Sequence, residues 1–132
     1  MESDEAERGS APVDGAEPGT VALERHAPGV AIVTLRGEHD LATRAEINAT
    51  LARVGGEADV LVDLSQCSFI DSSVIGALVA AFQTFAEGGR RLELAIPSDA
   101  VTIQRVAQVA GLATFLAIHE TREAGLASIS AT

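Results

Sequence analysis

Short apolar runs and longer amphipathic segments alternate along the sequence, and the apolar runs predict strands. Residues 21–26 and 30–35 flank the turn-forming pair Pro28-Gly29, so we expect a hairpin there. Further apolar runs have the length and composition of strands buried in a sheet. These runs cover residues 60–64, 92–96 and 114–118.

Segments with a helical period separate these strands. Ile47, Leu51 and Val54 recur at spacings of four and three residues, which is typical of one face of a helix. Asp99 is placed to cap a later helix, and Gly111 is placed to end it in the left-handed conformation. The expected helices cover residues 41–54, 72–86, 99–110 and 121–129.

The predicted order is therefore ββαβαβαβα. Strands that alternate with helices form parallel pairs joined by right-handed crossovers, and the opening hairpin adds an antiparallel edge. The chain has 132 residues, which fits one domain with a real core. We predict a small α/β sandwich with a mixed, mostly parallel sheet of about five strands.

The N-terminal segment differs from the rest of the chain. Residues 1–19 contain six acidic residues and one arginine among glycine, serine and proline, with few large apolar groups. Such a composition does not offset the entropy lost on ordering. We expect a disordered acidic tail over residues 1–19 and a folded domain over residues 20–132.

Charge and cysteine content exclude several classes of function. The formal net charge is −10 at pH 7, which disfavours direct binding of nucleic acid or of anionic lipid surfaces. Cys67 is the only cysteine, so no internal disulfide forms. The acidic start does not resemble a secretory signal, and the longest apolar run, residues 74–82, is too short to span a bilayer. We expect a cytoplasmic protein without membrane insertion.

The sequence gives little support to an enzyme. The nucleophile pattern G-x-S-x-G is absent around Ser72, because Ile70 and Val74 stand where glycines are needed. His39 beside Asp40 is the one tempting base, and we interpret it instead as a solvated residue of a polar loop over residues 37–40. We therefore predict no catalytic residues.

Metal and cofactor sites are not expected either. The histidines His26, His39 and His119 are scattered, and Cys67 has no neighbour at ligand spacing. The Gly-Gly pairs of the chain lack the lysine and the strand-to-helix context of a phosphate-binding loop. We predict neither a metal nor a cofactor.

The most informative stretch is Asp71-Ser72-Ser73, where a predicted strand gives way to a long apolar helix. Helix N-termini present unpaired N–H groups and a partial positive charge, so they favour oxygen ligands and anions. One residue of the three suffices as a helix cap. The local pattern alone favours a cap and leaves open an exposed serine that accepts a phosphate.

The order of several motifs resembles the anti-sigma factor antagonists of the STAS domain family. The resemblance covers roughly residues 20–130, with His39 where the family usually has leucine and Val74 where it usually has glycine. The matching segments are residues 35–40, 60–65, 69–73, Ile75-Gly76 and 109–112.

This resemblance implies a partner-switching regulator of transcription, of the kind also used in stress responses. The unphosphorylated antagonist binds an anti-sigma factor that is also a GHKL-type serine kinase, and so frees a sigma factor. The kinase then phosphorylates the serine that matches Ser72, and a serine phosphatase reverses the step. Ser73 is the second candidate hydroxyl. The alternative within the family is a STAS scaffold or subunit, stressosome-like or in a lipid-transport complex, in which phosphorylation plays no part.

The resemblance also implies an interaction surface around Ser72. Val74 adds bulk to the first helical turn, and we expect it to hinder docking or to alter partner choice. The residues expected to face the partner are Glu38, Asp40, Ile70, Asp71, Ser73, Val74 and Ile75.

Overall fold

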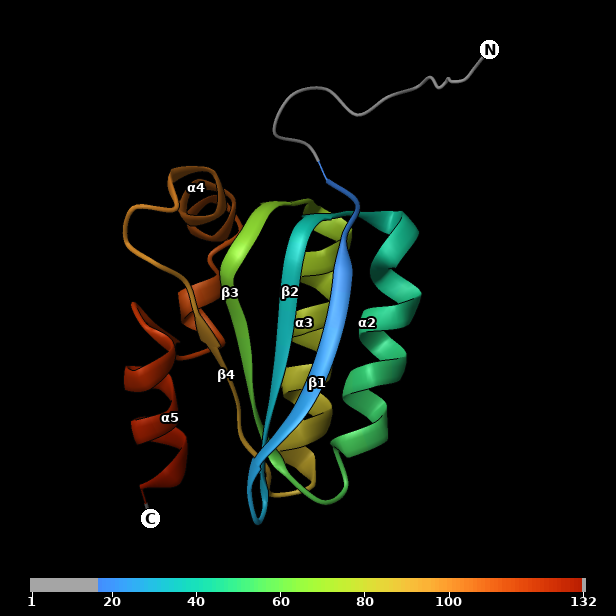
Figure 1. Cartoon of the computed structure of the whole chain (residues 1–132), viewed down its shortest axis with the longest axis vertical. Coiled ribbons are helices and arrows are strands. Elements are labelled where there is room, and N and C mark those ends of the chain that lie inside the picture. Colours follow the sequence, from blue (N-terminus) through green and yellow to red (C-terminus); the bar gives the residue numbers. More distant parts are fainter. Residues whose placement is uncertain (1–16, 132) are drawn as a thin grey trace.

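The computed structural model describes residues 17–131. Residues 1–16 of the predicted tail lie outside the described residues. The elements follow the predicted order ββαβαβαβα, with one additional 3-10 turn, η1. They are β1 (Thr20–Ala27), β2 (Val30–His39), α2 (Leu41–Val54), β3 (Asp59–Ile70), α3 (Ser72–Glu87), β4 (Leu92–Ala95), α4 (Val101–Val109), η1 (Leu112–Thr114), β5 (Ile118–His119) and α5 (Arg122–Ser130) (Figure 1).

The strands form one five-stranded sheet in the order β1-β2-β3-β4-β5. β1 and β2 are antiparallel, whereas β2, β3, β4 and β5 are parallel to their neighbours. This confirms the predicted mixed, mostly parallel sheet. Because the parallel strands run the same way, their C-terminal ends lie at one edge of the sheet. The helices that follow these strands begin at the same edge.

Alternating side chains of β3 divide the core between the two faces of the sheet. Val60 and Val62 belong to the main cluster, which α2 and α3 cover (Figure 1). Leu61 points to the opposite face, where it packs with Ala95 and Ile129 of α5. The period of two along the strand thus produces the sandwich.

Polar contacts complete the packing of α5. Arg122 Nη1 lies 3.5 Å from Oδ2 of Asp63, a carboxylate that is 1% exposed. The Ser128 hydroxyl donates to Glu93 Oε1 at 2.9 Å, and His119 Nε2 lies 2.8 Å from the same oxygen. These contacts give a buried carboxylate and a half-buried one partners on α5 and β5.

The polar loop predicted over residues 37–40 is wrong, because β2 continues to His39. Gly37 has a φ of 77° and lies at a register shift between β2 and β3, so the strand passes through a bulge instead of ending. Glu38 N also donates to Glu17 O at 3.1 Å. Residues 17–19, which we had assigned to the tail, thus lie against β2.

The strand predicted over residues 114–118 is also largely wrong. After Gly111, at φ 66° as predicted, the chain forms η1, and β5 contains only Ile118 and His119. Leu112 and Leu116 are both buried, and Leu116 N donates to Leu112 O. Residues four apart lie on the same side of a helical turn, so the turn buries both leucines. An extended strand over these residues is therefore not formed.

Asp99 does not cap α4, contrary to the prediction. The helix begins one residue later, after Ala100, without a side-chain cap. Ala100 N donates to Pro97 O, and this turn leaves the Asp99 side chain exposed in front of the helix. The amide of Gln104 donates to the carbonyls of Ile96 and Pro97 and fixes the helix to the end of β4.

The close packing of α5 on the sheet predicts a sensitive position at Gly125. A Cβ at this residue would lie 2.6 Å from Leu61 Cδ1, and both residues are buried. We expect Gly125→Val to lower the free energy of unfolding by about 1–3 kcal/mol through overpacking. Ala127→Val, at an exposed position of the same helix, is the control. Equal stability of the two variants in urea denaturation would show that α5 does not pack as described.

Candidate phosphorylation and partner-binding site

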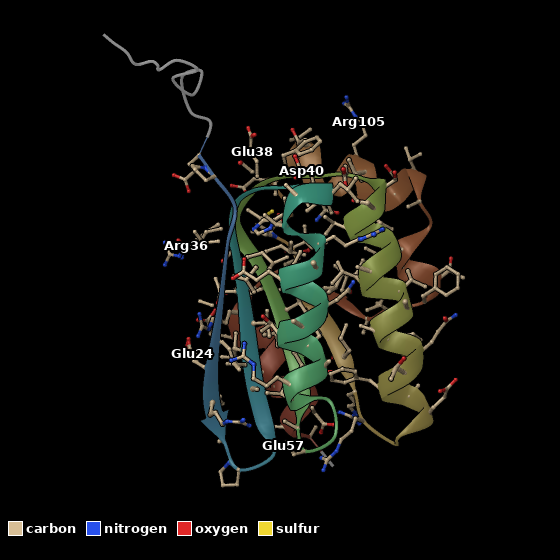
Figure 2. All side chains as sticks on the ribbon, turned by 90° about the vertical axis from the view of Figure 1, so that its right-hand side faces the viewer. Glu24, Arg36, Glu38, Asp40, Glu57 and Arg105 are labelled. Atoms are coloured by element: carbon tan, nitrogen blue, oxygen red, sulfur yellow. The ribbon has the colours of Figure 1, made fainter. Side chains whose placement is uncertain are left out.

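The register between β2 and β3 brings two helix N-termini together. His39 and Ile70, the last residues of these strands, are paired. The next residues, Asp40 and Asp71, cap α2 and α3 respectively. Both carboxylates, which lie far apart in the sequence, therefore stand at equivalent positions on one edge of the sheet. Figure 2 shows Glu38 and Asp40 at this end of the molecule.

Asp71 holds the first turn of α3. Its Oδ1 accepts hydrogen bonds from Ser73 N at 3.0 Å, Val74 N at 3.1 Å and the Ser73 hydroxyl at 2.6 Å. The Ser73 hydroxyl is the main cause that lowers the pKa of Asp71 below its usual value, with backbone N–H groups adding to it and burial opposing it. The carboxylate is thus fixed in its charged form beside Ser72.

Asp40 performs the same task for α2 with a single bond. Its Oδ1 accepts from Ala42 N at 2.9 Å, and the side chain is exposed. Glu38, two residues earlier, is exposed as well. The edge that carries Ser72 therefore presents negative charge from two neighbouring strand ends.

The two adjacent serines have different environments. Ser72 is exposed at the first position of α3, and no hydrogen bond of its hydroxyl is found within residues 17–131. Ser73 is half-buried and its hydroxyl donates to Asp71. An acceptor hydroxyl must reach the phosphate donor, so Ser72 is the more accessible of the two. The capping carboxylate and the exposed hydroxyl thus belong to different residues of Asp71-Ser72-Ser73.

Three of the residues predicted to face the partner are buried in the main core. Ile70 and Val74 are 0% exposed and Ile75 is 7% exposed, because this side of α3 packs against the sheet. The expected hindrance by Val74 is therefore wrong, since its side chain does not reach the surface. The predicted surface around Ser72 is reduced to Glu38, Asp40, Asp71 and Ser73.

His39 is not the solvated residue that we predicted. Its side chain is fully buried, with Nε2 2.9 Å from Arg36 O and Nδ1 2.9 Å from the Thr43 hydroxyl. Both ring nitrogens are thus occupied, and neither is free to activate a serine. Instead the ring joins the end of β2 to the first turn of α2, which positions Asp40. Continuing the alternation of Leu35 along the strand would have placed residue 39 in the core.

Two exposed apolar side chains at these strand ends were missed by the sequence analysis. Leu41, the first residue of α2, is 62% exposed, and Phe69, next to the end of β3, is 38% exposed. Leu41 is not at a helical spacing of three or four residues from the buried Ile47 or Leu51. This mismatch in the sequence could have indicated that Leu41 is exposed. The site therefore combines apolar surface with carboxylates, and protein interfaces commonly pair an apolar centre with a polar rim.

Other kinds of site find no support in the described part of the chain. No group of three or more His, Cys, Asp or Glu residues that could hold a metal ion occurs within residues 17–131. Among the helices described, none has the length and apolar character needed to cross a membrane. Burial raises the pKa of the Cys67 thiol to about 11, so this cysteine is a poor nucleophile.

The capping role of Asp71 predicts a loss of stability on substitution. We expect Asp71→Ala to lower the free energy of unfolding at pH 7 by about 0.5–2 kcal/mol, as other cap substitutions do. The pKa of the folded carboxyl is lowered from 3.8, so its contribution is full above this pH and disappears as the pH falls below it. The difference from wild type should therefore shrink in acid. Asp99→Ala, which removes an exposed carboxylate without a capping bond, should change stability little in the same urea titrations.

Comparison by sequence identifies one family. The sequence model of the STAS domain matches residues 23–125. A comparison with curated proteins gives no significant match.

Solved structures with the same fold include several anti-sigma factor antagonists. One from Mycobacterium paratuberculosis is 20% identical with a TM-score of 0.78, and 88% of this chain and 99% of that chain are covered. The phosphorylated form of SpoIIAA, a Bacillus cell fate determinant, is 23% identical with a TM-score of 0.65, covering 83% and 99%. A STAS domain protein from Planctomyces limnophilus, described as an anti-sigma-factor antagonist, is 20% identical with a TM-score of 0.70, covering 84% and 98%.

These similarities agree with the topology of the sheet. The identities are low, so the structural likeness establishes a shared fold, while the sequence match spans most of the chain. The resemblance noted from the motifs is confirmed: the chain belongs to the STAS domain family and has the fold of solved anti-sigma factor antagonists.

Proposed function

We propose that this chain is an anti-sigma factor antagonist that is switched by phosphorylation of Ser72. In its unphosphorylated form it binds an anti-sigma factor that is a serine kinase of the GHKL type, and a sigma factor is released. A serine phosphatase restores the binding form. The observation that carries the proposal is the exposed Ser72 hydroxyl, free of hydrogen bonds within residues 17–131, beside two capping carboxylates.

The physical effect of a phosphate at this position supports a switch. Phosphorylation adds a charge of about −1.5 to −2 at pH 7. In the free chain the added group is solvated, and the N-terminus of α3 stabilises it by about 0.3–1 kcal/mol at an exposed position. In a complex the same dianion loses water next to Asp71 and Asp40, which are already negative. Release of the partner is then favoured without a change of fold.

The surface around Ser72 also supports binding in the unphosphorylated state. Leu41 and Phe69 supply exposed apolar area, and Glu38 and Asp40 supply charge on the same edge. A partner with a basic rim and an apolar centre matches this arrangement. The kinase performs the chemistry, and this chain is its substrate.

The acceptor assignment predicts a simple result for serine variants. With the cognate kinase and Mg-ATP, wild type and Ser73→Ala should gain about 80 Da in intact-mass analysis, one phosphoryl group, while Ser72→Ala gains none. The serine kinases of the source genome form the panel to be assayed. A mass gain that survives in Ser72→Ala and disappears in Ser73→Ala would reverse the assignment. If no kinase in the panel modifies wild type, the chain is better described as a STAS scaffold.

The switch predicts opposite effects of two substitutions at one position on affinity for the kinase. Ser72→Ala should bind like wild type in calorimetry with ADP present. Ser72→Asp should bind at least about tenfold more weakly, because a charge is desolvated beside carboxylates. Ser130→Asp introduces the same charge at an exposed position near the end of α5 and should have no effect. Equal affinity of the two Ser72 variants would contradict the switch.

A further inference from the structure

Gly76 lies inside α3 without a reason in the described chain. Glycine is the least favourable residue in a helix interior after proline. A Cβ built at Gly76 meets nothing within 4 Å, and its φ is not in the left-handed range. Gly125 of α5 is different, because there a Cβ would meet Leu61 at 2.6 Å. Neither packing nor backbone conformation within residues 17–131 therefore explains the absence of a side chain at Gly76.

The position of Gly76 relates it to the proposed acceptor. Ser72 and Gly76 are four residues apart on α3, and both are exposed, so they share one face of the helix. Side chains on a helix lean toward its N-terminus and cover the turn that precedes them. A side chain at residue 76 would thus extend over the turn that carries Ser72. With glycine, the helix backbone beside the acceptor hydroxyl is bare.

We infer that Gly76 sets how closely a partner approaches Ser72, and so acts as a specificity-determining residue of the docking surface. The inference rests on the proposed function. A kinase brings a bound nucleotide to the Ser72 hydroxyl, and its own chain must contact α3 around that point. Gly76 admits a closely packed backbone segment or small side chain of the kinase, which any larger residue excludes. The benefit of glycine at this position thus lies in the contact with the kinase and not in the stability of α3.

Substitution of Gly76 tests this with two readouts that move in opposite directions. Gly76→Ala should raise the thermal midpoint by about 2–5 °C, because alanine favours the helix and its methyl group meets no atom. The same variant should lower kcat/KM for phosphorylation by about tenfold or more, since small displacements of reacting groups are costly. Gly76→Leu should lower it further while the fold is retained.

Two control variants add comparable bulk elsewhere. Gly56→Ala adds a methyl group at an exposed turn, where a Cβ also meets nothing within 4 Å. Ala86→Leu adds bulk at an exposed position in the last turn of α3. Both should be phosphorylated at the wild-type rate by the kinase that modifies Ser72.

The possible outcomes separate this inference from the proposed function. If wild type is phosphorylated and both Gly76 variants keep kcat/KM within about twofold of it, the inference is overturned while the function stands. If Gly76→Ala lowers the thermal midpoint together with kcat/KM, the glycine has an internal role, and the inference is again overturned. If no kinase modifies wild type at Ser72, both fall together.

Discussion

The pairing of His39 with Ile70 across the parallel strands β2 and β3 is the constraint on which the site depends. This register brings Asp40 and Asp71 to one edge, each at the start of a helix. A shift of one residue in this register would move the buried side chains of a strand to the opposite face of the sheet. The buried imidazole of His39 opposes such a slip, because both its nitrogens have partners in β2 and α2. The polar site is thus positioned by the core beneath it.

One carboxylate separates the tasks of three consecutive residues. Asp71 binds the backbone of α3 and occupies the Ser73 hydroxyl, which leaves the Ser72 hydroxyl exposed beside it. The structural and the proposed regulatory roles therefore coexist. Both depend on the charged carboxylate of Asp71: stability through the hydrogen bonds it accepts, and the proposed switch through its repulsion of an added phosphate. A cap requires one polar residue of the motif, and Asp71 is that residue. The Ser72 hydroxyl is not needed for the cap.

Much of this fold was predictable because local signals agree with the tertiary structure. The spacing of Ile47, Leu51 and Val54 matched α2, and Gly111 ended α4 as expected. The errors arose where a longer-range effect prevailed. A bulge at Gly37 extended β2, and the burial of Leu112 and Leu116 replaced most of a strand with a turn. For the candidate site, the motif singled out Asp71 and Ser72, but it did not show on which side of the helix Val74 lies, because that depends on how α3 packs.

The hydrogen bond between Glu38 N and Glu17 O has a practical consequence for studying the protein. It places Glu17, the first described residue, at the edge that carries Asp40, whereas the C-terminal end of α5 lies at the opposite end of the molecule (Figure 1). A segment joined directly to Glu17 would therefore start beside the docking surface proposed around Ser72. A label or affinity tag belongs at the C-terminal end, where Arg91 contacts the carbonyls of Ser128 and Ala131, far from the docking surface proposed around Ser72.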